Sequence, residues 1–271
     1  MKNLYIVLIV LFFYSCTDVV DIKLDTANPK LVVEASINWQ KGTVGNVQKI
    51  KLTNTSDYYT NKTPVVSNAT VTVSNSLNVV FNFIEIPNTG EYICNNFVPI
   101  LNETYKLTIV SNGKTFTATE TLKPIAEIQG IIQSNTGGIS SNEIQVNANF
   151  LDPAATEDFY LFKYEYPSKI KPDIYVTEDV FYNGNPFFSQ SFNNDLKVGD
   201  TFKITHYGVS KPYYKFLEIL LNISGNGGGG GPFQSPPVTV RGNVLNQTTP
   251  DDFPFGYFNL SEIDSKSYTI Q

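Results

Sequence analysis

Much of the chain alternates between apolar and polar residues with a period of two. The clearest stretches are residues 31–39, 69–73, 105–109 and 144–150. In the third of them, Tyr105, Leu107 and Ile109 alternate with Lys106 and Thr108. Successive side chains of a strand point to opposite faces of its sheet, so this pattern buries one face of each strand. The sequence therefore predicts a mainly β fold.

Turn residues divide these strands into antiparallel units. Asn112-Gly113 separates two alternating segments, and this pair supplies the positive φ angles that a tight hairpin needs. Several short strands at such spacing, without helical periodicity, are typical of an immunoglobulin-like sandwich. We predict that sandwich over residues 30–124, and a second antiparallel β-sandwich-like domain over residues 125–271.

One segment of the second domain has the pattern of a helix. In residues 211–224, Lys211, Lys215, Glu218 and Asn222 form a single polar stripe, and apolar side chains cover the remaining surface. This pattern predicts one mostly buried helix. The following residues 225–231 (GNGGGGG) lack the order of a phosphate-binding loop, and their composition is typical of a flexible loop.

The N-terminal residues have the pattern of an export signal. Lys2 precedes an apolar run over residues 4–14, which is shorter than the roughly 20 residues that span a bilayer as a helix. The run ends in Ser15-Cys16, which resembles a bacterial lipobox. We therefore predict a signal peptide over residues 1–15, lipidation at Cys16, and an acidic tether over residues 16–29. The alternatives are a plain secretory signal and a buried N-terminal strand.

Charge and cysteine content narrow the functional classes. The chain has 19 basic and 25 acidic residues, and removal of residues 1–15 takes one Lys, which leaves 18 against 25 and a net charge of −7. Arg241 is the only arginine, and no basic cluster exists that would indicate nucleic-acid binding. With Cys16 lipidated, Cys94 has no intrachain partner, and its apolar neighbours predict a small buried side chain.

The sequence contains no complete catalytic set. His206 is the only histidine, which excludes two-histidine metal motifs, and its place among alternating apolar residues indicates a hydrogen-bonded core histidine. A carboxylate pair for glycoside hydrolysis has no sequence signature. The candidates lie beside turns and are interpreted as solvated charges: Glu157, Asp158, Glu178 and Asp179. We therefore predict a protein that is not an enzyme and has neither cofactor nor metal.

Aromatic residues form the candidate contact site. They flank the turn-rich segment Asn183-Gly184-Asn185-Pro186, and aromatic side chains on loops provide large contact areas at little entropic cost. The candidate contact residues are Phe181, Tyr182, Phe187 and Phe188, with Phe192 nearby. Their ligand would be a glycan, a peptide or a protein. The alternative is that these rings fill the second core.

Several short motifs together resemble a known family. They are Leu31-Val32-Val33-Glu34, Val66-Ser67-Asn68-Ala69-Thr70-Val71, Gly90-Glu91-Tyr92, Thr104-Tyr105-Lys106-Leu107, Arg241-Gly242-Asn243-Val244 and Gly256-Tyr257-Phe258, in this order. With the lipobox, they resemble the DUF4249 family, a domain of unknown function in lipoproteins of Bacteroidota.

The resemblance implies an accessory outer-membrane lipoprotein at the cell surface, partnered with a TonB-dependent receptor in nutrient uptake, as SusD-like proteins are. It carries over no functional residues. Other readings stay open: a structural envelope or adhesion subunit, a glycan-active hydrolase, and a position on the periplasmic leaflet.

Overall fold

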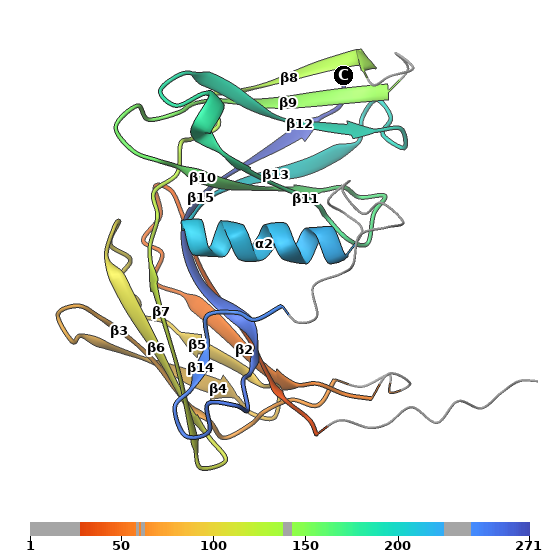
Figure 1. Cartoon of the computed structure of the whole chain (residues 1–271). Helices are drawn as coiled ribbons and strands as arrows, with labels where there is room; N and C mark the ends of the chain where they lie inside the picture. The colour runs from red at the N-terminus through yellow and green to blue at the C-terminus, as the bar shows by residue number, and fades with distance from the viewer. Residues whose placement is uncertain (1–27, 58–59, 61–62, 138–142, 225–239) are drawn as a thin grey trace, which may run out of the picture.

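The computed structural model describes residues 28–57, 60, 63–137, 143–224 and 240–271. It confirms the mainly β fold with two sandwich-like halves and one α-helix (Figure 1). Cys16 and the glycine-rich residues 225–231 lie outside the described residues. The strands are β1 Leu31–Gln40, β2 Gln48–Asn54, β3 Thr70–Asn75, β4 Val80–Ile86, β5 Glu91–Cys94, β6 Thr104–Ser111, β7 Lys114–Thr121, β8 Gly130–Gly137, β9 Glu143–Leu151, β10 Phe159–Glu165, β11 Asp173–Glu178, β12 Pro186–Asn193, β13 Thr201–Val209, β14 Leu245–Asn246 and β15 Phe255–Thr269, with the 3-10 helix η1 Asp179–Phe181 and the α-helix α2 Lys211–Ile223.

The first sandwich is one continuous sheet that folds over itself. The strand order of the large sheet is β11-β10-β13-β15-β1-β2-β5-β4-β3-β6-β7-β14. Strand β4 makes the turn between layers, because its first part pairs with β3 and its last residues pair with β5. The predicted β6–β7 hairpin is confirmed, with positive φ at Asn112 and Gly113. Between the layers lies a closed core of aliphatic and aromatic side chains.

The second half has three layers. Strands β11, β10, β13 and the end of β15 form the middle layer, and a separate sheet of order β12-β9-β8 covers one of its faces. Helix α2 covers the opposite face, where Tyr214 packs on Phe159 with ring centroids 5.2 Å apart. Figure 1 shows the three-stranded sheet as the outermost layer, at the end of the molecule away from the first sandwich.

Strand β15 belongs to both halves. Its first residues pair in parallel with β1, from Phe255 opposite Val32 onward, and its last residues pair antiparallel with β13. Phe258 and Leu260 of β15 lie in the first core, as does Val244. The predicted boundary at residue 124 therefore marks where the chain first leaves the first sandwich. Val244 and the first part of β15 return to it and complete its core.

The connection between the halves is fixed along β15. The backbone N–H of Ile125 donates to Glu262 Oε2 at 2.9 Å, and that of Ile128 donates to Asp264 Oδ2 at 2.8 Å. At Gly208 of β13, a Cβ would stand 1.8 Å from the carbonyl oxygen of Pro124, so only glycine allows this approach. The connection is therefore part of the packed structure.

Helix α2 forms at the predicted place but is less buried than its pattern predicts. Ser210 is its N-cap and accepts a hydrogen bond from the Tyr213 N–H at 3.2 Å. Only Tyr214, Leu217 and Leu221 are buried. The prediction of a mostly buried helix is wrong, because α2 lies on one face of the sheet and its outer apolar residues are exposed: Ile219, Leu220 and Ile223.

Candidate functional site

The predicted aromatic site divides into buried and exposed rings. Tyr182 follows η1 and is 5% exposed, and its ring stacks on Phe187 of β12 at 3.7 Å between centroids. Both rings meet the buried Phe150 edge-on. Phe181 is 96% exposed and Phe188 is 41% exposed. Tyr182 and Phe187 thus pack with the second core, whereas Phe181 and Phe188 face solvent.

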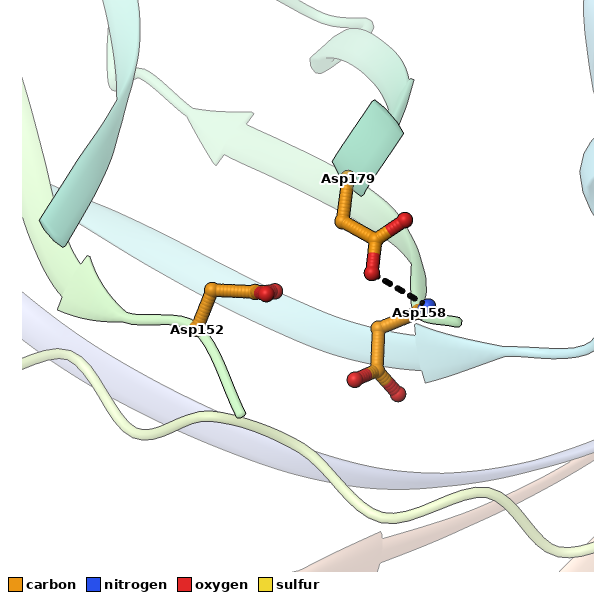
Figure 2. Close-up of side chains that lie close together, drawn as sticks. All are labelled: Asp152, Asp158 and Asp179. Atoms are coloured by element: carbon orange, nitrogen blue, oxygen red, sulfur yellow. Dashed lines mark hydrogen bonds between the residues drawn. The ribbon is translucent and has the colours of Figure 1, made fainter. Parts of the chain in front are cut away.

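The turn between η1 and β12 is held by three aspartates. Asp152, Asp158 and Asp179 bring carboxylate oxygens within 4.8 Å of one another (Figure 2). Asp152 Oδ2 accepts the Gly184 N–H at 2.9 Å, while Asp152 Oδ1 accepts the Tyr160 hydroxyl at 2.6 Å. The backbone carbonyl of Asp179 accepts the N–H groups of the two residues after η1. The aspartates therefore fix the turn that leads into β12.

The carboxylates of this cluster are mostly engaged by the protein itself. Asp179 Oδ2 accepts the Asp158 N–H at 2.9 Å, and Asp158 Oδ2 accepts the Thr156 hydroxyl at 2.6 Å. With the two oxygens of Asp152, four of the six carboxylate oxygens accept hydrogen bonds. Calcium requires six to eight oxygen ligands, and only Asp158 Oδ1 and Asp179 Oδ1 remain without a hydrogen bond to a described residue. The geometry therefore favours an acceptor cluster that shapes the turn.

The interpretation of these acids as solvated charges is wrong for Asp179 and incomplete for Asp158. Asp179 is 1% exposed, and Asp158 is half-buried. Burial, followed by the nearby carboxylates of Asp152 and Asp179, raises the pKa of Asp158. Their places beside turns suggested exposure, but the two residues contact each other through the hydrogen bond from the Asp158 N–H to Asp179 Oδ2. Glu157 is exposed and pairs with Lys211, as predicted for a surface charge.

His206 is buried, as predicted, but it is not hydrogen-bonded. Its ring stacks on Phe162 with centroids 4.4 Å apart and lies close to Phe150 and Tyr160. Neither ring nitrogen has a partner of normal hydrogen-bond geometry among the described residues, although the Ala126 backbone lies near enough to favour the charged form slightly. Burial dominates and lowers the pKa of His206 to about 3. The ring is therefore neutral at physiological pH and shielded from any substrate.

Cys94 is also in the predicted environment. It is 1% exposed within the first core, and its thiol lies 3.2 Å from Asn96 Oδ1. Burial raises the pKa of the thiol, which disfavours the reactive thiolate. Among the described residues no helix is long and apolar enough to cross a membrane.

The sequence also contained a signal that the prediction did not use. In β9 the inward residues Val146, Ala148 and Phe150 alternate with the amides Gln145, Asn147 and Asn149, which point outward. The apolar half of this alternation predicted the strand correctly. The polar residues of the same alternation place three amides in a row on the opposite face of the strand. These amides become part of a wider surface only because β9 pairs with β8 and β12.

The motifs that resemble DUF4249 meet one another in the structure. The side-chain amide of Asn243 donates to the Phe258 carbonyl at 2.8 Å and accepts the Phe258 N–H at 2.9 Å. Gly256 has φ +94°, and a Cβ there would stand 2.0 Å from the Val33 carbonyl oxygen. The Tyr92 hydroxyl donates to the Val66 carbonyl at 2.8 Å. These motifs therefore stabilise the first sandwich and the crossing of β15.

A family model for DUF4249, a domain of unknown function, matches residues 17–267. The chain belongs to the DUF4249 family. No curated protein matches it. Because the motif residues just described hold the fold together, membership in DUF4249 identifies the architecture and leaves the ligand open.

Solved structures show only remote similarity to this DUF4249 protein. A two-domain fibronectin type III segment of chicken tenascin is 14% identical, with 67% of this chain and 91% of that chain covered and a TM-score of 0.23. A DUF4785 family protein of Legionella pneumophila is 8% identical over 66% of this chain and 52% of that one, with a TM-score of 0.27. A pullulanase of Anoxybacillus sp. LM18-11, complexed with maltotriose, is 10% identical over 67% and 25%, with a TM-score of 0.21.

Proposed function

We propose that this protein is a non-catalytic lipoprotein of the outer membrane, anchored through Cys16 at the cell surface, that captures a ligand for a TonB-dependent receptor. The observation that carries the proposal is the short apolar run of residues 4–14 behind Lys2, which ends in Ser15-Cys16. Such a run suits a signal peptide, and the cysteine that follows it suits lipid attachment.

The arrangement of the fold supports an anchored protein with an outward-facing end. Cys16 lies twelve positions before Asn28, so an extended tether reaches at most about 40 Å. The first described residues lie at the end of the first sandwich that is far from the β12-β9-β8 sheet (Figure 1). Lipid attached to Cys16 would therefore hold the first sandwich near the bilayer and direct the second half away from it.

A cationic cluster lies on the first sandwich close to the first described residues. Lys30 and Lys114 contact Asp252 at 3.7 and 2.7 Å, and the ring of Phe253 lies between Lys30 Nζ at 3.9 Å and the Arg241 guanidinium at 4.0 Å. Three cations and one carboxylate leave this cluster with a charge of +2. Such a cluster favours approach to a negatively charged membrane surface.

The arrangement of titratable groups supports a protein that binds without catalysis. His206 is neutral and enclosed by aromatic rings, and most oxygens of the aspartate cluster already accept protein hydrogen bonds. A glycosidase needs an acid and a second carboxylate that both reach the substrate. Two of the three aspartates are 1–2% exposed.

Lipid labelling tests the anchor. Cells that express the full chain are grown with a radiolabelled fatty acid, and their membranes are fractionated. We expect Cys16→Ala to abolish label and release the protein from membranes, while the matched control Cys94→Ala keeps both label and membrane attachment. Label that survives Cys16→Ala would contradict the anchor.

Co-purification tests the partner. The tagged, lipidated chain is isolated from detergent-solubilised outer membranes, and we expect a large β-barrel receptor to accompany it. Isolation of the chain without any barrel, together with retained membrane attachment, would favour the structural envelope or adhesion subunit instead.

A further inference from the structure

The outer face of the three-stranded sheet presents nine residues in three aligned rows. Because β9 is buried on one side at Val146 and Ala148, and β12 at Ser189 and Ser191, the alternate residues of these strands point outward. The register gives the rows Phe188–Asn149–Gly130, Gln190–Asn147–Ile132 and Phe192–Gln145–Ser134. Exposed fractions of 41% for Phe188, 39% for Phe192 and 59% for Ile132 confirm that this face is open to solvent. We call these nine residues the outer grid.

Four of the nine grid residues are amides, and three of them are joined by hydrogen bonds. Gln145 Nε2 donates to Asn147 Oδ1 at 3.1 Å, and Gln190 Nε2 donates to the same oxygen at 3.2 Å. Asn147 Nδ2, the Oε1 atoms of both glutamines and the whole amide of Asn149 make no hydrogen bond to another described residue. Because an amide both donates and accepts, the grid offers fixed hydrogen-bonding groups of both kinds.

Two aromatic rings border these amides on the edge strand. Phe188 and Phe192 stand four residues apart on β12, which places their Cα atoms about 13 Å apart. Gln190 lies between them, and Asn149, Asn147 and Gln145 run alongside on β9. The grid thus combines flat apolar surfaces with a line of amides beside them.

The geometry points to a linear, neutral oligosaccharide as the ligand of the outer grid. A sugar ring has an apolar face of C–H groups and a rim of hydroxyls that both donate and accept, so the face suits the rings of Phe188 and Phe192 and the hydroxyls suit the amides. The chain of sugars would follow β12, with Asn149 and Asn147 reaching its hydroxyls. This inference rests on the proposed function, and it names the ligand class of a protein that captures without catalysis.

Charge and composition favour a sugar over other ligands. None of the nine grid residues is charged, so the grid offers no opposite charge to a phosphate, a carboxylate or an ammonium group. A protein partner would bury four amides, and each amide would require its own hydrogen-bond partner. Protein interfaces are enriched in Tyr, Trp, Phe, Met and Arg, and of these types the grid has only its two Phe residues. The face also lies at the end of the molecule opposite the first described residues (Figure 1).

Calorimetric titration tests the inference on the whole chain after the anchor, residues 17–271. The probes are cellohexaose, maltohexaose, mannohexaose and xylohexaose, with hexagalacturonate as the charged counterpart. We expect saturable binding of at least one neutral probe and none of the charged one. Asn149→Ala should weaken that binding tenfold or more without changing the Tm, because the Asn149 amide makes no hydrogen bond to a described residue. Phe188→Ala should weaken it as much and lower the Tm only slightly, because the ring is 41% exposed and stacks on Phe187 with centroids 5.4 Å apart.

Phe181→Ala is the matched control, since it removes an exposed ring from η1 rather than from the grid. It should leave the affinity unchanged. The inference is overturned if no neutral probe binds, if the grid variants bind as the parent does, or if only Phe181→Ala loses binding. Self-association that the grid variants abolish would also overturn it and assign the face to a second copy of the chain. If no neutral saccharide binds but the receptor still co-purifies with the chain, the inference about the outer grid fails and the proposed function stands.

Discussion

The two halves of the molecule use their buried tyrosines differently. In the first sandwich, the Tyr92 and Tyr105 hydroxyls donate to backbone carbonyls of Val66 and Val98, which lie in loops of the same sandwich. In the second half, two tyrosines join one layer to the next, because Tyr164 of β10 and Tyr166, which follows that strand, hydrogen-bond to Ser189 and Ser191 of β12. The first arrangement fixes loops, whereas the second fixes the position of a whole sheet.

The halves also differ in the ionisable groups that they bury. The first core is a closed cluster of apolar side chains and tyrosines. The second half encloses His206 and the carboxylates of Asp152 and Asp179, whereas the buried Glu120 of β7 lies where the first sandwich meets the second half and accepts the Ser210 hydroxyl. A buried polar group costs free energy unless it is bonded. Asp152 and Asp179 accept hydrogen bonds, whereas His206 has no partner of normal geometry among the described residues, so His206 lowers the stability of the second half. This difference is expected where a surface must be held in register for binding.

The largest effect is expected from a charge placed under helix α2. Leu217 is 7% exposed, so Leu217→Asp buries an unpaired carboxylate and should lower the free energy of unfolding by about 4 kcal/mol or more. Because β15 pairs with strands of both halves, we expect the loss to reach the first sandwich as well. Trp39, the only tryptophan, lies in β1 and reports on that half by its fluorescence.

The measurement compares urea unfolding by Trp39 fluorescence and by circular dichroism. Both midpoints should fall together in Leu217→Asp, while Ile219→Asp on the exposed side of the same helix changes them little. A fluorescence midpoint that stays at the parent value would show that the halves unfold independently, against the role given to β15.

The next effect separates the buried from the exposed rings of the aromatic segment. Tyr182→Ala removes a ring that is 5% exposed and stacked on Phe187, and it should cost about 3–5 kcal/mol. Phe181→Ala removes a ring that is 96% exposed and should leave the Tm nearly unchanged. Thermal unfolding of both variants checks this pair, and equal Tm values for the two would contradict the placement of Tyr182 in the core.

The smallest effect is electrostatic. Burial and two neighbouring carboxylates raise the pKa of Asp158, so the folded state holds this proton more tightly than the unfolded state does. Ionisation then costs stability as the pH rises from the ordinary range of aspartate, about 4, through the raised value. Asp158→Asn should therefore raise the Tm slightly at pH 7 and leave it unchanged at pH 3. A Tm that falls at pH 7 would contradict this.

The sequence predicted elements well where the pattern was local. Alternation placed β1, β3, β6 and β9, and Asn112-Gly113 placed the hairpin, because strand faces and turn geometry depend on neighbouring residues. The degree of burial of α2 was missed, because it depends on what covers the outer side of the helix. The pairing of β15 with both halves was also missed. Its contact with β1 joins residues more than 200 positions apart, and no local pattern indicates such a contact.

The candidate site was predicted in part. The aromatic segment was identified, but only cross-strand register separates Phe188, on the open face, from Phe187, which packs inward. Asp152 directly follows β9, and its hydrogen bond to Gly184 joins segments 32 residues apart, which no local pattern predicts. The outer surface is assembled from residues of three strands, so no single stretch of sequence indicates it.

The contrast between a supporting first sandwich and a binding second half is tested most directly by nuclear magnetic resonance. Residues 17–271, labelled with nitrogen-15, are titrated with the tightest-binding of the four neutral hexasaccharides, and the side-chain amide signals are followed. We predict shifts of the Gln145, Asn147, Asn149 and Gln190 amides and none for the side-chain amides of the first sandwich. Shifts confined to the first sandwich, or no shifts at any saccharide concentration, would contradict the account.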